Sequence, residues 1–250
     1  MFKVPRLKVN RADDLLGEFL ATAAEFLNTE PYSLVLVEDP TEVHLIGEVK
    51  TVIPAELRLV LGDALHNLRA SLDVLANDAV CQQIASGKRD ALFPMAKDLE
   101  TFERWLTKNL PGAATDLVDV IRNSQPFNRA SPWLRRLHDF DIADKHRTSL
   151  PVVGNPAFHD IRVRQRHTGG TISIGAVHLD AAKVGQKRFM SVAKTMNFDF
   201  DRNVNHSFFF AITDELASSG IDVESAFYEM RKEVFSTIEA VEALFFKSAT

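Results

Sequence analysis

The chain has 250 residues, of which 46% are hydrophobic and 25% charged, and its net charge of −5 is ordinary for a soluble globular protein. The negative balance argues against a whole-protein basic field that attracts nucleic acid without sequence preference, and leaves room only for a local basic patch. One cysteine, Cys81, rules out a disulfide framework and a cysteine-based zinc site, and the apolar runs are too short for a signal peptide or for the ~18 residues of a membrane helix. The sequence therefore predicts a cytoplasmic protein that does not contact a membrane.

The first half of the chain has mostly helical patterns, interrupted by one pair of β-rich runs. Asp13 or Asp14 is expected to cap the first helix, and Pro54 opens a long second one. Ser131 caps a later helix that begins at Pro132. The expected helices are 13–28, 54–85, 97–109, 112–123 and 132–147, and the expected strands are 32–39 and 41–50.

Beyond Pro151 the sequence changes from helical periodicity to alternation, which is typical of strands. A His-Thr-Gly-Gly sequence at 167–170 predicts a hairpin turn between two of them. One strand face would present Arg162, Arg164 and Arg166, either to solvent or to the phosphates of a nucleic acid. The expected strands are 159–167, 170–179, 196–203 and 206–214, and a final helix is expected at 222–246.

This order of elements predicts an α+β fold within a single domain, residues 1–250. We expect mainly an α-helical bundle with a small antiparallel β-sheet beside it. The helical core is expected at about 55–150 and 221–247, and the strands at about 33–50 and 160–213.

The long helix carries a polar face apart from its leucines. His66, Arg69 and Asp73 share this face, at spacings of three, four and seven residues. Arg69 and Asp73 are four residues apart, so their side chains can pair along the helix. Because little of this helix is fully polar, we expect His66 and Arg69 to be only partly exposed. Two interpretations stay open, a solvent-facing ion pair and a part of a polar site.

The segment LRRLHDFDIADKHR, residues 134–147, sets carboxylates among the apolar residues of one helix face. At about 100° per residue, Asp141 and Asp144 fall within the apolar sector. An isolated buried carboxylate is very costly, so these aspartates must be paired, protonated or metal-bound once the face packs. His66 and Arg69 are the most suitable partners in the chain. The edges of the sector and the adjoining face carry further polar residues: His138, Lys145, His146 and Arg147.

Three hypotheses fit these two helices. The first is a buried polar network that fixes the register of the helices. The second is a general acid/base site that uses His138 or His146 beside the carboxylates and Arg69. The third is a divalent-metal site, since histidine and aspartate suit several metals. Its ligands would be drawn from His66, Asp73, His138, Asp141 and Asp144. We favour the first two hypotheses and expect neither a bound metal nor a cofactor.

The same segments resemble an uncharacterised family of bacterial and phage proteins. Its members carry a Leu-His-Asn-Leu-Arg-x-x-Leu-Asp helix, here 65–73, then a Phe-Pro connector, and later an Asp-x-x-Asp-Lys-His-Arg helix, here 141–147. The resemblance covers roughly 55–150 of this chain. It places the polar positions of the family on His66, Asn67, Arg69, Asp73, Asp141, Asp144, Lys145, His146 and Arg147.

More distantly, the helical part is similar to HEPN domains, many of which bind or cleave RNA and commonly act as dimers. The resemblance implies an RNA-binding or RNA-processing protein, such as a ribonuclease of a bacterial defence or toxin system. RNA is then the expected partner and a homodimer the expected assembly. HEPN ribonucleases carry an arginine shortly before the catalytic histidine, at a spacing that neither His138 nor His146 has. The basic partner must therefore come from elsewhere in the fold or from a second subunit.

The functional hypothesis assigns roles to the residues of the second helix. His146 would be the general acid/base, while Lys145 and Arg147 would hold a phosphate and two aspartates would orient them. The full expected catalytic set is His146, Asp144, Lys145, Arg147, Asp141 and His138. The alternative is a non-catalytic binding or scaffold protein, in which these residues and the polar face of the long helix form a buried structural network.

Overall fold

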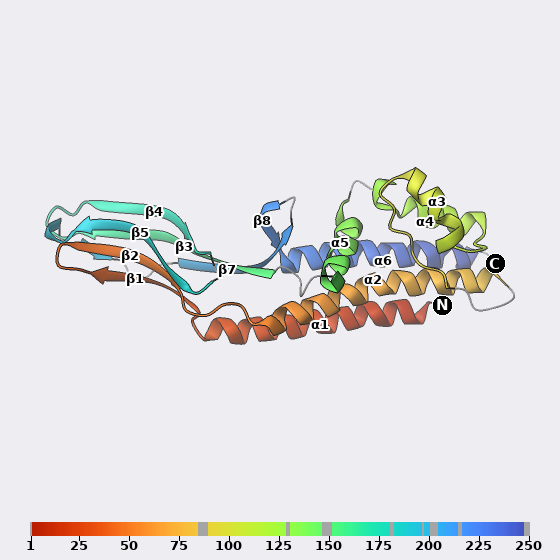
Figure 1. The fold of residues 1–250 in the computed structure, drawn as a ribbon, viewed down its shortest axis with the longest axis horizontal. Helices are drawn as coiled ribbons and strands as arrows, with labels where there is room; N and C mark the ends of the chain where they lie inside the picture. The colour runs from red at the N-terminus through yellow and green to blue at the C-terminus, as the bar shows by residue number, and fades with distance from the viewer. Residues whose placement is uncertain are drawn as a thin grey trace. The chain divides into compact units, whose positions relative to one another are not determined.

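The chain folds into two compact units in the computed structural model, one mainly helical and one mainly of strands (Figure 1). The described residues are 2–84, 90–128, 131–146, 152–180, 183–196, 198–200, 205–214 and 217–247. The helical unit spans Met1–Leu20, Arg58–Leu150 and Glu224–Thr250, and the strand unit spans Ala21–Leu57 and Pro151–Val223. Each unit is built around apolar residues of its own.

The helical unit is formed by α-helices that come from both ends and the middle of the chain. The described α-helices are α1 (Lys3–Asn28), α2 (Ala55–Gln83), α3 (Leu99–Asn109), α4 (Thr115–Asn123), α5 (Trp133–His146) and α6 (Val223–Lys247), and short 3-10 helices lie at Pro126–Asn128 and Lys194–Met196. Ion pairs join α1 to α6, Arg6 with Glu242 and Asp13 with Arg231. Arg6, early in α1, pairs with Glu242, late in α6, and Asp13, later in α1, pairs with Arg231, earlier in α6, so the two helices run antiparallel.

The long helix α2 contributes the central leucine stripe of the helical unit. Its spacing of three and four residues places every member on one side of a helix. The stripe consists of Leu61, Leu65, Leu68, Leu72 and Leu75, each at most 1% exposed. Burying a leucine side chain in this way stabilises a fold by roughly 1.5–3 kcal/mol. The opposite side of α2 is consequently left for polar residues.

Helix α1 begins at Lys3, well before the start expected at Asp13 or Asp14. Pro5 lies in the first turn, where backbone N–H groups have no acceptor within the helix, so a proline is tolerated there. The apolar stripe also continues to the N-terminal end, since Val9 is fully buried. The expectation was wrong because it treated the aspartates as a cap and did not follow the stripe beyond them.

The strand unit contains two antiparallel sheets. The described strands are β1 (Tyr32–Glu38), β2 (Glu42–Val49), β3 (Val152–Gln165), β4 (Thr171–His178), β5 (Gly185–Ala193), β6 (Phe198–Phe200), β7 (Asn205–Asp214) and β8 (Ala217–Asp222). One sheet has the order β1-β2-β5, and the other has the order β4-β3-β7-β8 with β6 also paired to β3. Leu45 of the first sheet meets Ile161 and Val177 of the second in a shared apolar cluster. The two sheets therefore pack face to face.

The expected fold, mainly a HEPN-like helical bundle with a small sheet, is wrong, although an α+β composition is present. Eight described strands form two sheets with their own core, which is a substantial second part of the molecule. The sequence pattern did not predict two of the strands, β5 and β8. Strand β5 is exposed along most of its length, so it lacks the alternation of a half-buried strand. Apart from Ile221, strand β8 consists of small and polar residues with weak β-propensity.

Candidate functional site

The candidate site lies within the helical unit, where one face of α2 meets one face of α5. The Nδ1 atom of His66 donates a hydrogen bond to Oδ1 of the Asp141 carboxylate over 2.8 Å. The Asp141 side chain is 5% exposed, whereas the His66 side chain is 47% exposed. Asp141 lies among buried apolar residues of α5 such as Leu137, as the helical period predicted. A half-exposed imidazole is thus oriented by a buried carboxylate from another helix.

Lys145 completes the hydrogen bonding of the buried carboxylate. Its Nζ atom donates to Oδ2 of Asp141 over 2.7 Å, one helical turn further along α5. Both oxygens of Asp141 are therefore occupied, one by the imidazole of His66 and one by an ammonium group. The Lys145 side chain is about half exposed, so its positive charge is available at the surface beside the imidazole.

Asp144 lies against the backbone of α2 at Gly62. A Cβ atom added to Gly62 would come within 2.6 Å of the Asp144 carboxylate, closer than real Cβ contacts allow. Gly62 and His66 are four residues apart on α2, and Asp141 and Asp144 are three apart on α5, so each pair shares a helix face. A side chain at position 62 would therefore force the Asp144 carboxylate to move away from α2.

Arg69 and Asp73 form a second polar group, which ties α2 to the connector before α3. Arg69, 8% exposed, donates from Nη1 to Oδ1 of Asp73 over 2.8 Å and from Nη2 to the carbonyl oxygen of Phe93 over 2.9 Å. The same Asp73 oxygen accepts the backbone N–H of Phe93 over 2.9 Å. The ion pair expected from the spacing is present, with Arg69 buried and Asp73 partly exposed. We call the group formed by Arg69, Asp73 and the backbone of Phe93 the connector clamp. Asn67 bonds only to its own helix, at the carbonyl of Asp63, among the described residues.

His138 lies on α5 in a half-buried position, and its expected catalytic role stays a prediction. Burial is the largest cause that lowers its pKa, and the positive charges of Arg69 and Arg135 lower it further. Its Nδ1 atom is buried and has no hydrogen-bond partner within the described part of the chain. The lowered pKa keeps the imidazole neutral near pH 7, with its Nδ1 atom turned away from solvent.

The expected roles of His146 and Arg147 stay predictions. His146 is the last residue of α5, and its side chain lies outside the described part of the structure, as does all of Arg147. What the structure adds is His66, which the sequence suggested as a partner and not as a candidate acid/base. No local pattern could have shown this, because the orienting carboxylate is 75 residues away along the chain.

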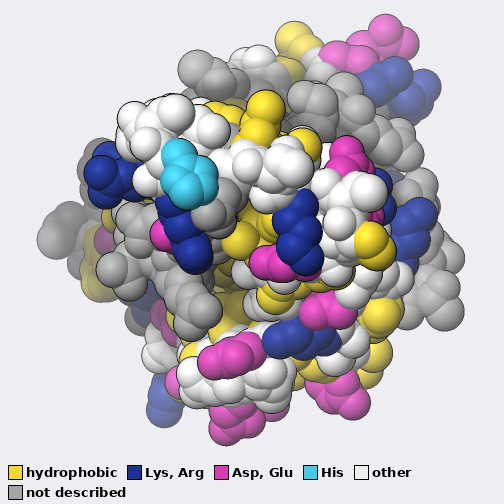
Figure 2. Space-filling model, turned by 90° about the vertical axis from the view of Figure 1, so that its left-hand side faces the viewer, with side chains coloured by type: hydrophobic (Ala, Val, Ile, Leu, Met, Phe, Trp, Pro, Cys, Tyr) yellow, Lys and Arg dark blue, Asp and Glu magenta, His cyan; other side chains and the backbone are white. Residues whose placement is uncertain are grey.

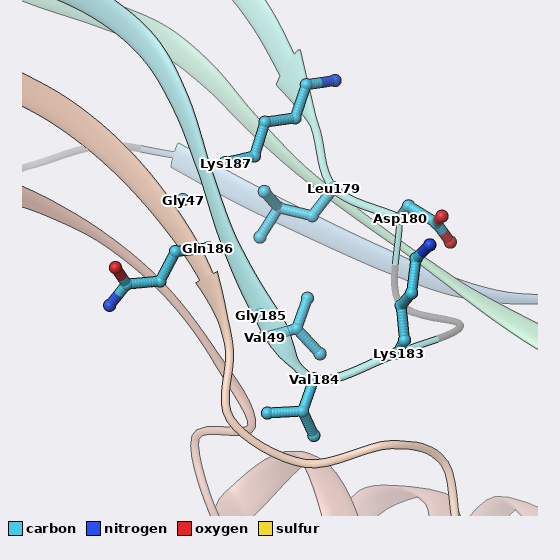
Figure 3. A pocket seen from close by; sticks show the side chains of 9 residues that line it. All are labelled: Gly47, Val49, Leu179, Asp180, Lys183, Val184, Gly185, Gln186 and Lys187. Atoms are coloured by element: carbon cyan, nitrogen blue, oxygen red, sulfur yellow. The ribbon is translucent and has the colours of Figure 1, made fainter.

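A separate pocket of about 320 Å³ opens on the strand unit and contains none of the expected site residues (Figure 3). Its lining includes Leu179 and Val49, with Lys183 and Lys187 as the basic side chains. Figure 3 shows that Lys187 extends away from Val49. The pocket therefore offers an apolar surface with scattered charges and no imidazole in its lining.

The basic strand face is solvated rather than gathered into a uniform patch. Arg162, Arg164 and Arg166 are all exposed on and beside β3, and Arg166 forms an ion pair with Asp199. The face of the molecule in Figure 2 shows Lys and Arg side chains interspersed with Asp and Glu. This arrangement favours the solvent-facing interpretation of the three arginines over a phosphate-binding surface.

Comparison with known proteins found no family model, no curated protein and no solved structure that matches this chain. Among the described helices, none combines the length and apolar character needed to cross a membrane. The functional conclusion therefore rests on the geometry of the site.

Proposed function

We propose that this chain is an RNA-processing protein that uses His66 as a general acid/base, oriented by Asp141. The observation that carries the proposal is the 2.8 Å bond from the His66 ring to a carboxylate that is 5% exposed, while the imidazole is 47% exposed. A buried carboxylate that holds one ring nitrogen fixes the tautomer and leaves the other nitrogen for chemistry. The proposal requires neither the HEPN fold nor the HEPN arginine.

The chemistry follows from the protonation states that this pair favours. With Nδ1–H donated to Asp141, the lone pair of Nε2 points away from the carboxylate and can accept a proton. Among the described residues, no side chain bonds to Nε2 of His66. The negative charge of Asp141 then stabilises the imidazolium that forms. An imidazole in this position typically contributes about 10²–10⁴-fold to the rate of a proton-transfer step.

Two features support RNA as the substrate. The first is the ammonium of Lys145, which adds a positive charge beside the imidazole, as an anionic phosphodiester requires. The second is the more distant resemblance of the helical part of the sequence to HEPN domains, many of which bind or cleave RNA. RNA also carries its own nucleophile, the ribose 2′-hydroxyl, so a base that takes its proton can start cleavage at the adjacent phosphorus. The 2′-oxygen bonds to phosphorus as the P–O5′ bond breaks, and the leaving 5′-oxygen takes a proton from water, which gives a 2′,3′-cyclic phosphate and a free 5′-hydroxyl.

The test is cleavage of mixed structured and single-stranded RNA by the purified full chain in EDTA. The informative variant is His66→Asn, whose side-chain amide can keep the bond to Asp141 but has no basic nitrogen. The matched control is His159→Gln, because His159 bonds through Nε2 to Ser207 in the strand unit. We expect cyclic-phosphate ends with the wild type and the control, and none with a folded His66→Asn protein. Absence of cleavage by the wild type, or equal cleavage by His66→Asn, would overturn the proposal.

The second candidate function is a non-catalytic binding or scaffold protein. The observation that favours it is the connector clamp, in which Arg69, Asp73 and the backbone of Phe93 satisfy one another and are partly or fully buried. If His66 and Asp141 serve only to fix α5 on α2, then His66→Ala, which removes the bond that His66→Asn can keep, weakens the fold, and no RNA is cleaved by any variant. Unfolding measurements on the same proteins separate the two functions.

A further inference from the structure

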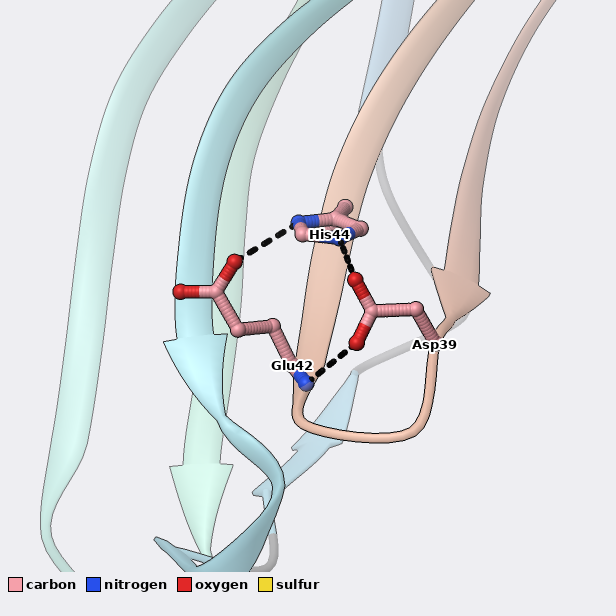
Figure 4. Close-up of side chains that lie close together, drawn as sticks. All are labelled: Asp39, Glu42 and His44. Carbon is pink, nitrogen blue, oxygen red and sulfur yellow. Dashed lines mark hydrogen bonds and ion pairs between the residues drawn. The ribbon is translucent and has the colours of Figure 1, made fainter.

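The tip of the β1–β2 hairpin gathers three metal-binding side chains that the proposed RNA site does not use. Asp39, Glu42 and His44 each offer one donor atom, and these atoms all lie within 4.8 Å of one another (Figure 4). We propose that this cluster, the hairpin-tip site, binds a zinc ion. One imidazole and two carboxylates are ligands that zinc accepts, and the imidazole favours zinc over magnesium or calcium.

The local sequence positions the carboxylate of Asp39. Its Oδ1 atom accepts the backbone N–H of Thr41 over 2.8 Å, the hydroxyl of Thr41 over 3.1 Å and the backbone N–H of Glu42 over 2.7 Å. These bonds form the side-chain-capped turn that aspartate favours. They leave Oδ2 directed at His44, whose Nε2 atom lies 2.8 Å away. The carboxylate is thus fixed beside the Nε2 atom of His44.

His44 is held from its other ring nitrogen. Nδ1 bonds to the hydroxyl of Ser191 on the neighbouring strand β5 over 2.8 Å, and the residue is 3% exposed. Metal-binding histidines usually have such a partner on the nitrogen that does not bind the metal, which fixes the ring orientation. Zinc would replace the proton between Nε2 and Oδ2. Ligand atoms on a tetrahedral zinc are about 3.3 Å apart, so the pair has to open by only about 0.5 Å.

Glu42 supplies the third ligand from the open side of the cluster. It is two residues before His44 on β2, so both side chains point to the same face of the sheet. Its Oε2 atom is 4.0 Å from Nδ1 of His44, the ring nitrogen that faces Ser191, so the carboxylate has to rotate to reach an ion beside Nε2. Its side chain is 46% exposed, which leaves room for this rotation. The Asp39 side chain is 42% exposed, which gives the ion a path from solvent. Water would complete the coordination.

The experiment is calorimetric titration of ZnCl₂ into the full chain, with MgCl₂ as the comparison ion. The variants are Glu42→Gln and His44→Asn, the latter keeping a group that can bond to Ser191. The control is Glu48→Gln, at a carboxylate further along β2 that bonds to Ser33 and Gln186. We expect one zinc per chain, binding at least tenfold weaker in Glu42→Gln, no binding in His44→Asn and unchanged binding in the control.

Two results would overturn the proposal: no zinc binding by the wild type, or equal binding by Glu42→Gln. Replacement of the buried His44 can disturb the hairpin. If His44→Asn does not fold, the zinc affinity of Glu42→Gln decides, because the side chain of Glu42 is about half exposed. Equal responses to magnesium and zinc would likewise contradict an imidazole-containing site and would indicate a non-specific carboxylate effect.

Discussion

Replacement of Arg69 by methionine tests whether the connector clamp stabilises the helical unit. Methionine keeps an unbranched chain of similar length but removes the guanidinium group. Two bonds are lost, to Oδ1 of Asp73 over 2.8 Å and to the carbonyl of Phe93 over 2.9 Å. Since Arg69 is 8% exposed, water cannot replace the guanidinium freely.

The expected loss of stability follows from the groups that lose their hydrogen bonds to Arg69. Removing one member of a buried ion pair costs about 3–5 kcal/mol, because the remaining charge is uncompensated. The Asp73 side chain is 30% exposed and keeps the N–H of Phe93, so solvent and this bond reduce the cost. We therefore expect Arg69→Met to lower the free energy of unfolding by about 2–4 kcal/mol. That is a large part of the roughly 5–15 kcal/mol by which a protein is stable.

The assay is urea unfolding followed by far-ultraviolet circular dichroism. Asn67→Ala is the control on the same helix, because the side chain of Asn67 is exposed and bonds only to the backbone of Asp63 among the described residues. We expect the control to change stability by no more than about 0.5 kcal/mol. An unfolding free energy of Arg69→Met within that range of the wild type would refute the reasoning, because the clamp would then contribute no net stability.

Three further predictions concern both units. The pKa of Asp39 is held well below its usual value, first by the hydrogen bond from His44 and then by backbone N–H groups of the turn. Such a carboxyl stabilises the fold while it is ionised. The wild type should therefore exceed Asp39→Asn in free energy of unfolding by its full amount near neutral pH in EDTA, and by less as the pH falls below about 4. A stability difference that does not change with pH would contradict this. A Cβ atom added at Gly17 in α1 meets no atom within 4 Å. Gly17→Ala should therefore raise the free energy of unfolding by about 0.5–1 kcal/mol, seen as a higher urea midpoint. Gly47→Ala in β2 would place a Cβ atom 2.3 Å from a methyl carbon of Leu179 and should cost about 1–3 kcal/mol, so an unchanged midpoint would refute the close packing there.

Helix positions were largely predictable because their signals are local. Helix α3 begins after Asp98, whose side chain accepts the backbone N–H of Thr101 over 2.7 Å, in agreement with a helix expected at 97–109. The hairpin of β1 and β2 also follows the expected ranges. The size of the strand part was not predictable, because β5 pairs with β2 across more than a hundred residues and shows no alternation of its own.

The candidate site was predictable in its residues but not in its pairing. The helical period placed Asp141 on the apolar face, and burial then required a partner for it. Both His66 and Arg69 were suitable, and only the packing of α5 on α2 decided between them. Arg69 instead donates hydrogen bonds to Asp73 and to the carbonyl oxygen of Phe93 in the connector. Contacts between distant segments depend on how the helices pack, which no single stretch of sequence specifies.

The most direct test of the proposed function is the single-turnover rate of RNA cleavage in EDTA, measured for the wild type and for a folded His66→Asn protein. We predict a rate at least about 100-fold lower for His66→Asn, the lower limit expected for loss of a general base. Equal rates for the two proteins, or no cleavage by the wild type, would contradict the claim that the imidazole oriented by Asp141 performs the chemistry.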